Sequence, residues 1–309
     1  MRDLWRAWRR KVRNLMRTAM NDQLQPRQSR HCWMRRLNAT AFGALLAILG
    51  MSIAPQAIAG EIESVFAKND PASKVEIDHS DWDKLLKKYL RKASDGLNRV
   101  NYEAFRKDGR KTLIGYLDRL QAVDVTGLNG DEQFAFWVNL YNAKTIEIIL
   151  EHYPVKSIKD IDISPGLFAD GPWKKKVVKV NNVKLSLDDI EHTILRALWR
   201  DNRVHYAVNC ASVGCPNLAL GAYKGVTLNS MLDASARAYI NSPRGVRLKD
   251  GRITASKIYR WFRKDFGNSE KAILEHIGRY AEPTLAEKIK GATDIYDYEY
   301  DWGLNDTKG

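Results

Sequence analysis

One histidine and two cysteines stand close together in the chain, and they are the side chains best suited to chemistry. They are His205, Cys210 and Cys215, in the segment R-V-H-Y-A-V-N-C-A-S-V-G-C-P (Arg203–Pro216). The β-branched and aromatic run Val204–Val208 predicts a short buried strand. The small residues that follow predict a tight loop. A polar trio at the end of a strand can hold a reactive thiol, a disulfide or a metal ion.

A thiol enzyme is the first interpretation of this segment. A Cys–His pair is the usual constellation of such enzymes, because the imidazole lowers the pKa of the thiol and later donates the proton. Here Cys210 would be the nucleophile, His205 or His192 the base, and Glu191 an acid that orients the imidazole. The pattern therefore predicts a thiol-dependent hydrolase or an acyl/amide transferase.

Three asparagines are expected to support this site. Asn139 and Asn142 lie at i and i+3 on one face of an otherwise apolar helix, and Asn209 shares a strand face with His205. A buried amide left unpaired costs on the order of 1–3 kcal/mol. The helix asparagines are therefore expected to bind the backbone of a neighbouring loop, and the sharper hypothesis is that this loop runs from Cys210 to Cys215.

A disulfide competes directly with the thiol interpretation. In an oxidising compartment, Cys210 and Cys215 can be bridged without strain across a Gly-containing loop. So small a ring would contribute about 2 kcal/mol. The protein would then be a non-enzymatic binding module of the cell envelope with a disulfide-braced loop. Zinc binding by this pair with His205 and His192 is disfavoured, because H-x4-C-x4-C matches no common ligand spacing. We predict no metal and no cofactor.

Residues 1–59 are predicted to form a basic leader and a signal peptide. Residues 37–59 carry no charge, and their apolar core is shorter than the about 20 residues that cross a bilayer as a helix. The sequence A-I-A before Gly60 fits a signal-peptidase site, and a start at Met34 would leave a short basic region. We therefore expect a periplasmic or secreted protein. The alternative is an inner-membrane anchor formed by residues 37–59, the one membrane contact we expect if this segment is not cleaved.

Most of the net charge of +13 lies in the leader. Residues 1–36 hold 11 of the 50 basic and two of the 37 acidic side chains, which leaves 39 basic and 35 acidic side chains in the rest of the chain, a net charge of +4. A near-balanced surface gives no argument for nucleic-acid binding. The expected partner is an unknown small molecule or a component of the cell envelope.

The remaining chain predicts an α+β fold: a mainly helical single domain over residues 81–305, with small antiparallel hairpins and a C-terminal strand, after a loose polar lead-in at residues 60–80. The expected helices are Asp81–Lys92, Asp108–Leu120, Gly130–His152, Leu187–Trp199, Leu228–Ile240, Lys257–Phe266 and two more before the C-terminal strand. The expected hairpins are Val177–Val180 with Val183–Leu185 and Val246–Leu248 with Arg252–Thr254.

Five ordered motifs resemble one known family. They are F-W-V-N-L-Y-N-A (Phe136–Ala143), W-K-K-K-V-V-K-V (Trp173–Val180), S-L-D-D-I-E-H-T-I-L-R (Ser186–Arg196), V-H-Y-A-V-N-C-A-S-V-G-C-P (Val204–Pro216) and Y-D-W-G-L-N (Tyr300–Asn305). Together they are similar to the family catalogued as domain of unknown function 547, in its bacterial, exported form. The resemblance implies the domain and leaves the chemistry open, because the family brings no established activity and no catalytic residue to carry over.

Overall fold

The computed structural model of the protein describes residues 55–166 and 170–308. The chain divides into two compact units, and the fold described below is that of Ala59–Pro165 with Ala169–Gly309. Most of the predicted leader and signal peptide, residues 1–54, lies outside the described residues. In the described part of the chain, no helix is both long and apolar enough to cross a membrane.

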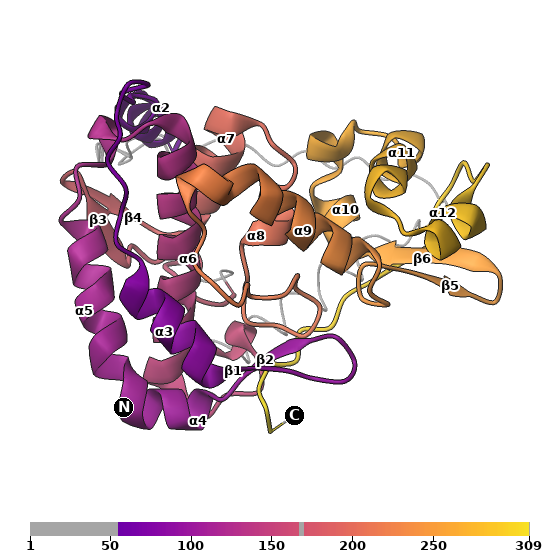
Figure 1. Ribbon diagram of the computed structural model, residues 1–309, viewed down its shortest axis with the longest axis horizontal. Coiled ribbons are helices and arrows are strands. Elements are labelled where there is room, and N and C mark those ends of the chain that lie inside the picture. The colour runs from indigo at the N-terminus through magenta and orange to yellow at the C-terminus, as the bar shows by residue number, and fades with distance from the viewer. Residues whose placement is uncertain (1–54, 167–169, 309) are drawn as a thin grey trace, which may run out of the picture. The chain divides into compact units, whose positions relative to one another are not determined.

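Helices and small sheets together confirm the α+β class (Figure 1). The helices are α2 (Pro55–Phe66), α3 (Ser80–Tyr89), α4 (Tyr102–Ala104), α5 (Arg110–Gln121), α6 (Gly130–His152), α7 (Arg196–Trp199), α8 (Val204–Ala207), α9 (Leu228–Ile240), α10 (Lys257–Trp261), α11 (Glu270–Tyr280) and α12 (Pro283–Ile289). The strands are β1 (Leu90–Lys92), β2 (Asn98–Val100), β3 (Val178–Val180), β4 (Val183–Leu185), β5 (Val246–Lys249), β6 (Arg252–Ser256) and β7 (Asp297–Glu299).

Helix α6 runs through the centre of the larger hydrophobic core. The side chain of Asn129 accepts a hydrogen bond from the backbone N–H of Glu132 and so caps its first turn. The helix is buried on nearly all sides and packs against α5 and α9. Its predicted bounds are confirmed to the residue. Because the helix is enclosed, Asn139 and Asn142 face the protein interior and must find partners there.

A second hydrophobic cluster forms around the three-stranded sheet β5-β6-β7. Helices α9, α10 and α11 pack there, at the side of the unit where Figure 1 shows β5 and β6. Helix α8 joins the two cores, since Val204 and Ala207 belong to the α6 core and Tyr206 belongs to the sheet core. The cysteine loop that follows α8 therefore begins at a helix that is held by both hydrophobic cores.

Both predicted hairpins are present. Asn181 and Asn182 have φ values of 45° and 66°, and Asp250 and Gly251 have 51° and 73°. Two-residue turns of this kind need positive φ at both central positions, which Asn, Asp and Gly tolerate. The antiparallel pairings β3–β4 and β5–β6 follow from these turns.

The segment Val204–Ala207 is an α-helix, so the prediction of a strand there is wrong. All four of its side chains are buried, and only from Val208 onward is the backbone extended. A β-branched run this short is decided by tertiary packing rather than by propensity. Asn209 therefore lies outside the helix that carries His205, and the two do not share a strand face.

The expectation of a loose lead-in at residues 60–80 is also wrong. Ile62 and Phe66 of α2 are buried in the α6 core, and the Phe66 and Trp137 ring centroids lie 4.9 Å apart. His79 is 2% exposed. The stretch is polar in overall composition, but Ile62 and Phe66 lie one helical turn apart on the same face of α2. Burial of these two side chains packs the segment against the domain.

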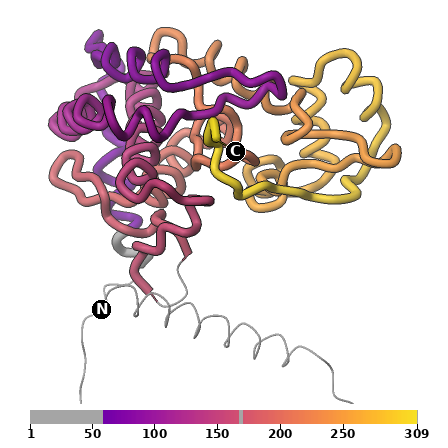
Figure 2. The backbone as a smooth tube through the Cα atoms, turned by 90° about the horizontal axis from the view of Figure 1, so that it is seen from below, coloured from indigo at the N-terminus to yellow at the C-terminus, as the bar shows by residue number. Residues whose placement is uncertain are grey.

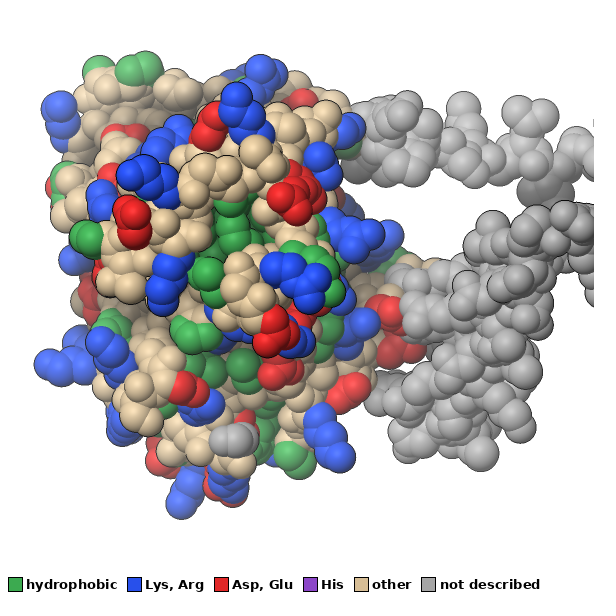
Figure 3. All heavy atoms as spheres, turned by 90° about the vertical axis from the view of Figure 1, so that its right-hand side faces the viewer, with side chains coloured by type: hydrophobic (Ala, Val, Ile, Leu, Met, Phe, Trp, Pro, Cys, Tyr) green, Lys and Arg blue, Asp and Glu red, His purple; other side chains and the backbone are tan. Residues whose placement is uncertain are grey.

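The expected C-terminal strand is present and spans three residues, Asp297–Glu299. Strand β7 pairs with β6 in parallel, and Tyr296 before it is 55% exposed. Basic and acidic side chains are interspersed over the face that Figure 3 presents, as a near-balanced charge predicts.

Candidate functional site

A cavity of about 200 Å³ brings together most of the side chains singled out in the sequence. Its lining includes Glu191, His192, His205, Cys210 and Cys215. These residues come from the helical segment before α7, from α8 and from the loop after it. His205 and both cysteines thus lie in one pocket-sized region.

The two cysteine sulfurs lie within disulfide-bonding distance of each other, and their Cα atoms are 6.3 Å apart, inside the usual range for a bridge. The phenol oxygen of Tyr300 lies 3.1 Å from each sulfur. The hydroxyl of Ser212 lies 3.3 Å from Cys210 Sγ. The polar contacts of the sulfurs are thus hydroxyl groups and the Cys210 backbone N–H, 3.0 Å from Cys215 Sγ.

Two asparagines hold the cysteine loop in shape. Asn142 Nδ2 donates to the carbonyl of Ala207 at 2.9 Å, and its Oδ1 accepts from the backbone N–H of Asn209 at 2.8 Å. Asn209 Nδ2 in turn donates to the carbonyl of Pro216 at 2.7 Å, and its Oδ1 accepts from the Ala211 N–H. The buried amides therefore replace the backbone pairing that an irregular loop lacks.

Asn139 serves a different segment. Its amide accepts from the Tyr223 N–H at 3.0 Å and donates to the Tyr223 carbonyl at 2.8 Å. It also lies 3.2 Å from His79 Nε2. The two asparagines of one helix face thus fix two different loops, and only Asn142 binds the cysteine loop.

The C-terminal segment runs alongside the cysteine loop. The backbone N–H of Gly214 donates to the carbonyl of Asp301 at 2.8 Å, and that of Val213 donates to the carbonyl of Gly303 at 2.7 Å. A Cβ on Gly214 would lie only 2.8 Å from the Asp301 nitrogen, so this approach needs glycine. Figure 2 shows the yellow C-terminal trace returning toward earlier segments. The contact brings Tyr300 and Trp302 to the cavity.

A half-buried arginine, two residues before β5, supports the same loop. Arg244 Nη1 donates to the carbonyls of Val213 and Cys215, and its Nη2 donates to Asn217 Oδ1 at 3.1 Å. Burial lowers the pKa of this guanidinium. The loop is thus held by side chains from three separate parts of the fold.

His205 is buried, and its partner is a carboxylate. Its Nε2 lies 2.7 Å from Asp265 Oδ2, and its ring stacks on Phe262 with centroids 4.1 Å apart. Arg196 donates to both oxygens of the same carboxylate, at 2.6 and 3.0 Å. Burial lowers the pKa of His205, although Asp265 opposes this shift. The pKa of Asp265 is well below its usual range despite partial burial, because His205 and Arg196 both hydrogen-bond it.

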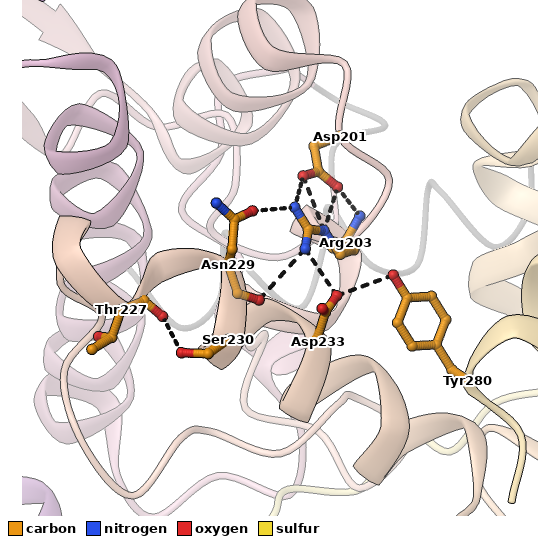
Figure 4. A network of polar contacts seen from close by, with 7 residues as sticks. All are labelled: Asp201, Arg203, Thr227, Asn229, Ser230, Asp233 and Tyr280. Carbon is orange, nitrogen blue, oxygen red and sulfur yellow. Dashed lines mark hydrogen bonds and ion pairs between the residues drawn. The ribbon is translucent and has the colours of Figure 1, made fainter.

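A polar network fixes the start of α8. Figure 4 shows the Arg203 guanidinium between Asp201, Asp233 and the side chain and backbone carbonyl of Asn229. The distances are 2.6 Å to Asp201 Oδ2, 2.8 Å to Asp233 Oδ1 and 2.7 Å to Asn229 Oδ1. Tyr280 completes the network with a 3.2 Å hydrogen bond to Asp233. His205 follows two residues after this anchor, so its ring is positioned by α9 as well as by α8.

The acidic wall of the cavity lies on a π-helical segment, Asp189–Leu195. Ser186 caps the start of this region, since the Asp189 N–H donates to Ser186 Oγ at 3.1 Å. Glu191 accepts from the Tyr141 hydroxyl at 3.0 Å. Irregular helical turns of this type often occur at functional sites. Burial raises the pKa of Asp188, which precedes the segment and also lines the cavity.

Aromatic rings form much of the remaining wall. They belong to Tyr141, Trp173, Trp261, Phe262, Tyr300 and Trp302. Trp261, Tyr300 and Trp302 form one cluster, with centroid separations of 4.7 to 5.6 Å. These rings were not among the residues predicted for the site. Tyr141, Trp173, Asp188, Tyr300 and Trp302 belong to the five ordered motifs, which offered a signal, whereas none of those motifs contains Trp261, Phe262 or Asp265.

Residues 125–240 match the model of a family described as "Protein of unknown function, DUF547". This segment belongs to that family. The match confirms the family inferred from the motifs, and the DUF547 segment contains α6, α8 and the cysteine loop. Trp261, Asp265 and Tyr300 lie C-terminal to it. No curated protein and no solved structure matches the chain significantly.

Proposed function

We propose that this chain is a binding module of the cell envelope, and that its disulfide-braced loop shapes a pocket for a small molecule. The carrying observation is the pairing of Cys210 with Cys215, whose side-chain polar neighbours are the hydroxyl groups of Ser212 and Tyr300, while His205 pairs with Asp265. In this proposal the sulfurs brace the wall of the cavity. The envelope location rests on the uncharged run at residues 37–59.

The cavity itself fits this role. Ligand sites are concave and mostly apolar, with a few polar groups that fix orientation. Here the aromatic rings supply the apolar surface, and Asp188, Glu191 and His192 supply the polar groups. His192 is 39% exposed through its side chain, so the polar edge of the cavity opens to solvent.

Two measurements test this proposal. Alkylation of the unreduced, denatured protein with iodoacetamide should leave Cys210 and Cys215 unlabelled, and labelling of both in freshly isolated protein would overturn the brace. Saturation-transfer NMR with benzyl alcohol should show contact with the native protein. Filling the cavity by Val208→Phe should abolish that contact, while Val226→Phe, at a side chain 75% exposed and outside the cavity lining, should not.

A thiol-dependent hydrolase or acyl/amide transferase is the second candidate, acting after the pair is reduced. The favouring observation is that His205, with Asp265 at 2.7 Å, lines the same cavity as both sulfurs. Cys210 would attack a carbonyl carbon, and His205 or His192 would take the thiol proton and return it to the leaving group. Glu191 would support the imidazole of its neighbour.

This candidate requires reductant. Hydrolysis of p-nitrophenyl acetate should then appear only with dithiothreitol, disappear in Cys210→Ser and persist in Cys215→Ser. Equal rates for the oxidised protein, the reduced protein and Cys210→Ser would exclude it.

A further inference from the structure

We propose that the cavity selects a small organic cation, an amine or a quaternary ammonium group, and this inference rests on the proposed binding function. The rings of Trp261, Tyr300 and Trp302 would contact the cation, and Asp188 and Glu191 would balance its charge. Four observations support this: the geometry of the rings, their existing contacts with cations, the carboxylates, and the charges around them.

The rings are inclined to each other rather than stacked flat. Trp261 and Tyr300 have centroids 4.8 Å apart and planes at 59°, and Tyr300 and Trp302 have centroids 4.7 Å apart and planes at 57°. Trp173 meets Trp302 edge-on at 5.8 Å. Inclined rings form adjoining walls, and a cage of such walls is the arrangement that binds quaternary ammonium groups.

Rings of this cavity already contact the protein's own cations. Lys159 Nζ lies 5.4 Å from the centroid of Trp302, and the Arg196 guanidinium lies 4.7 Å from that of Phe262. Both distances fall within the range of a cation–π attraction. The aromatic wall is therefore electrostatically favourable to positive charge.

Two carboxylates in the lining lack a fixed cation. Among the described residues, the ion-pair contact of both Asp188 and Glu191 is with His192, at 3.8 Å in each case. Glu191 also accepts the Tyr141 hydroxyl and is 9% exposed. The Asp188 side chain is 29% exposed, and its raised pKa agrees with a half-buried carboxylate short of positive partners, since burial is the main cause and Glu191 adds to it.

The surrounding charges do not cancel these two. Asp265 and Arg196 neutralise each other in a bidentate pair. Lys174 acts on Asp188 only beyond ion-pair distance, and weakly compared with His192. One half-exposed imidazole therefore faces two carboxylates. A buried charge is costly unless it is paired, so a cation in the cavity would gain more than a neutral molecule of the same shape.

The test compares two probes of equal shape and different charge. Isothermal titration calorimetry on the oxidised protein, after removal of the leader, uses choline and its uncharged isostere 3,3-dimethylbutan-1-ol. We expect choline to bind at least tenfold more tightly at low salt. The double variant Asp188→Asn/Glu191→Gln should lose that preference and keep binding of the alcohol. Glu275→Gln is the matched control, because this carboxylate is exposed and its ion pair among the described residues is with Lys271.

A ring variant separates the aromatic contribution from the carboxylates. Trp261→Leu keeps an apolar side chain and removes the ring, and should weaken choline about tenfold while affecting the alcohol little. Tyr296→Leu, at a ring outside the cavity lining, is its control.

The outcomes distinguish this inference from the binding function beneath it. Equal affinities for both probes would overturn cation selectivity and leave a general small-molecule pocket. Binding of benzyl alcohol or methyl glucoside without any choline binding would also overturn it. If none of these probes binds, the proposed binding function fails together with the inference.

Discussion

The imidazole Nε2 of His205 lies 2.7 Å from Oδ2 of Asp265, and Arg196 donates one hydrogen bond to each oxygen of the same carboxylate. One nitrogen of the only fully buried histidine in the cavity lining is therefore already occupied by a carboxylate. An imidazole held in this way is well oriented, and it is also part of a structural cluster that joins α8 to the segment after α10. The His205–Asp265 contact can therefore be tested through the free energy of unfolding as well as through activity.

Replacing Asp265 by Ala should destabilise the domain by about 2–3 kcal/mol, because Arg196 and His205 would both lose a charged acceptor in a partly buried site. Asp265→Asn keeps one acceptor oxygen and should cost less. Urea denaturation measures both. Equal and negligible changes in the free energy of unfolding would mean that the cluster is solvated in solution.

Stability should also fall as the pH drops from about 6.5 to 4. Burial lowers the pKa of His79 and of His276 to about 4, whereas an unfolded histidine titrates near 6.5. In this window the unfolded chain binds protons that the folded chain does not, so unfolding becomes easier by about 1.4 kcal/mol per pH unit for each histidine. The depressed pKa of Asp265 adds its own loss only below about pH 4, where an unfolded carboxyl begins to protonate.

Denaturant titrations at several pH values test this slope. His79→Gln should reduce this slope, and His276→Gln should do the same, while His205, whose pKa is also lowered by burial, keeps contributing in both variants. A stability that stays flat between pH 6.5 and 4.5 would contradict the expected burial of both rings. The control is His152→Gln, at a partly exposed helix end where the ring contacts a backbone carbonyl.

The long helices of this fold could be predicted from the sequence, because residues close to each other in the chain determine where these helices form. Helices α6 and α9 have their predicted bounds to the residue, because apolar residues repeat with helical period and an N-cap or a proline marks an end. The turn at Asn181 was equally readable, since few residues tolerate its positive φ. Val204–Ala207 was not, because a four-residue segment between two cores takes the conformation that buries its side chains.

Some residues of the candidate site could likewise be predicted from a local pattern, and others could not. The cysteines and His205 were close in sequence and are found in one cavity. Trp261 of α10 lines that cavity and Asp265 of the turn after α10 contacts His205, both more than 40 residues later, and no local pattern relates them to the site. The roles of Asn142 and Asn139 also differ because the helix face that carries them meets two loops, which only the tertiary structure determines.

These two asparagines give a local prediction. Asn142→Ala should destabilise the domain by about 1–3 kcal/mol, because the Ala207 carbonyl and the Asn209 N–H would remain unpaired in the interior. Hydrogen exchange should then speed up at the Asn209 amide and stay unchanged at the Tyr223 amide. Asn139→Ala is the matched control, with the opposite pattern expected. A change within about 0.5 kcal/mol would show that Asn142 is solvated.

Reduction of the cysteine pair should have a modest and specific effect. Loop-closure entropy for so short a ring predicts a loss of about 2 kcal/mol in the free energy of unfolding. Unfolding of the wild type should therefore shift on addition of dithiothreitol, whereas Cys210→Ser/Cys215→Ser should unfold at one midpoint with or without it. If the unfolding midpoint of the wild type does not change with dithiothreitol and both thiols react without it, the pair is not bridged in the isolated protein.

The start of the mature chain can be tested against the packing of α2. We predict that the protein isolated from the envelope begins at Gly60, which N-terminal sequencing checks, and that recovery of residues 1–59 in the membrane would identify an anchor instead.

A chain that begins at Gly60 keeps Phe66, whose ring is fully buried against Trp137. Phe66→Ala in that chain should cost about 3–5 kcal/mol, as expected for a large ring removed from a core. Glu63→Ala, on the exposed face of the same helix, should change stability by less than about 0.5 kcal/mol. If both variants unfold at the wild-type midpoint, the segment after the cleavage site does not pack on the domain in solution.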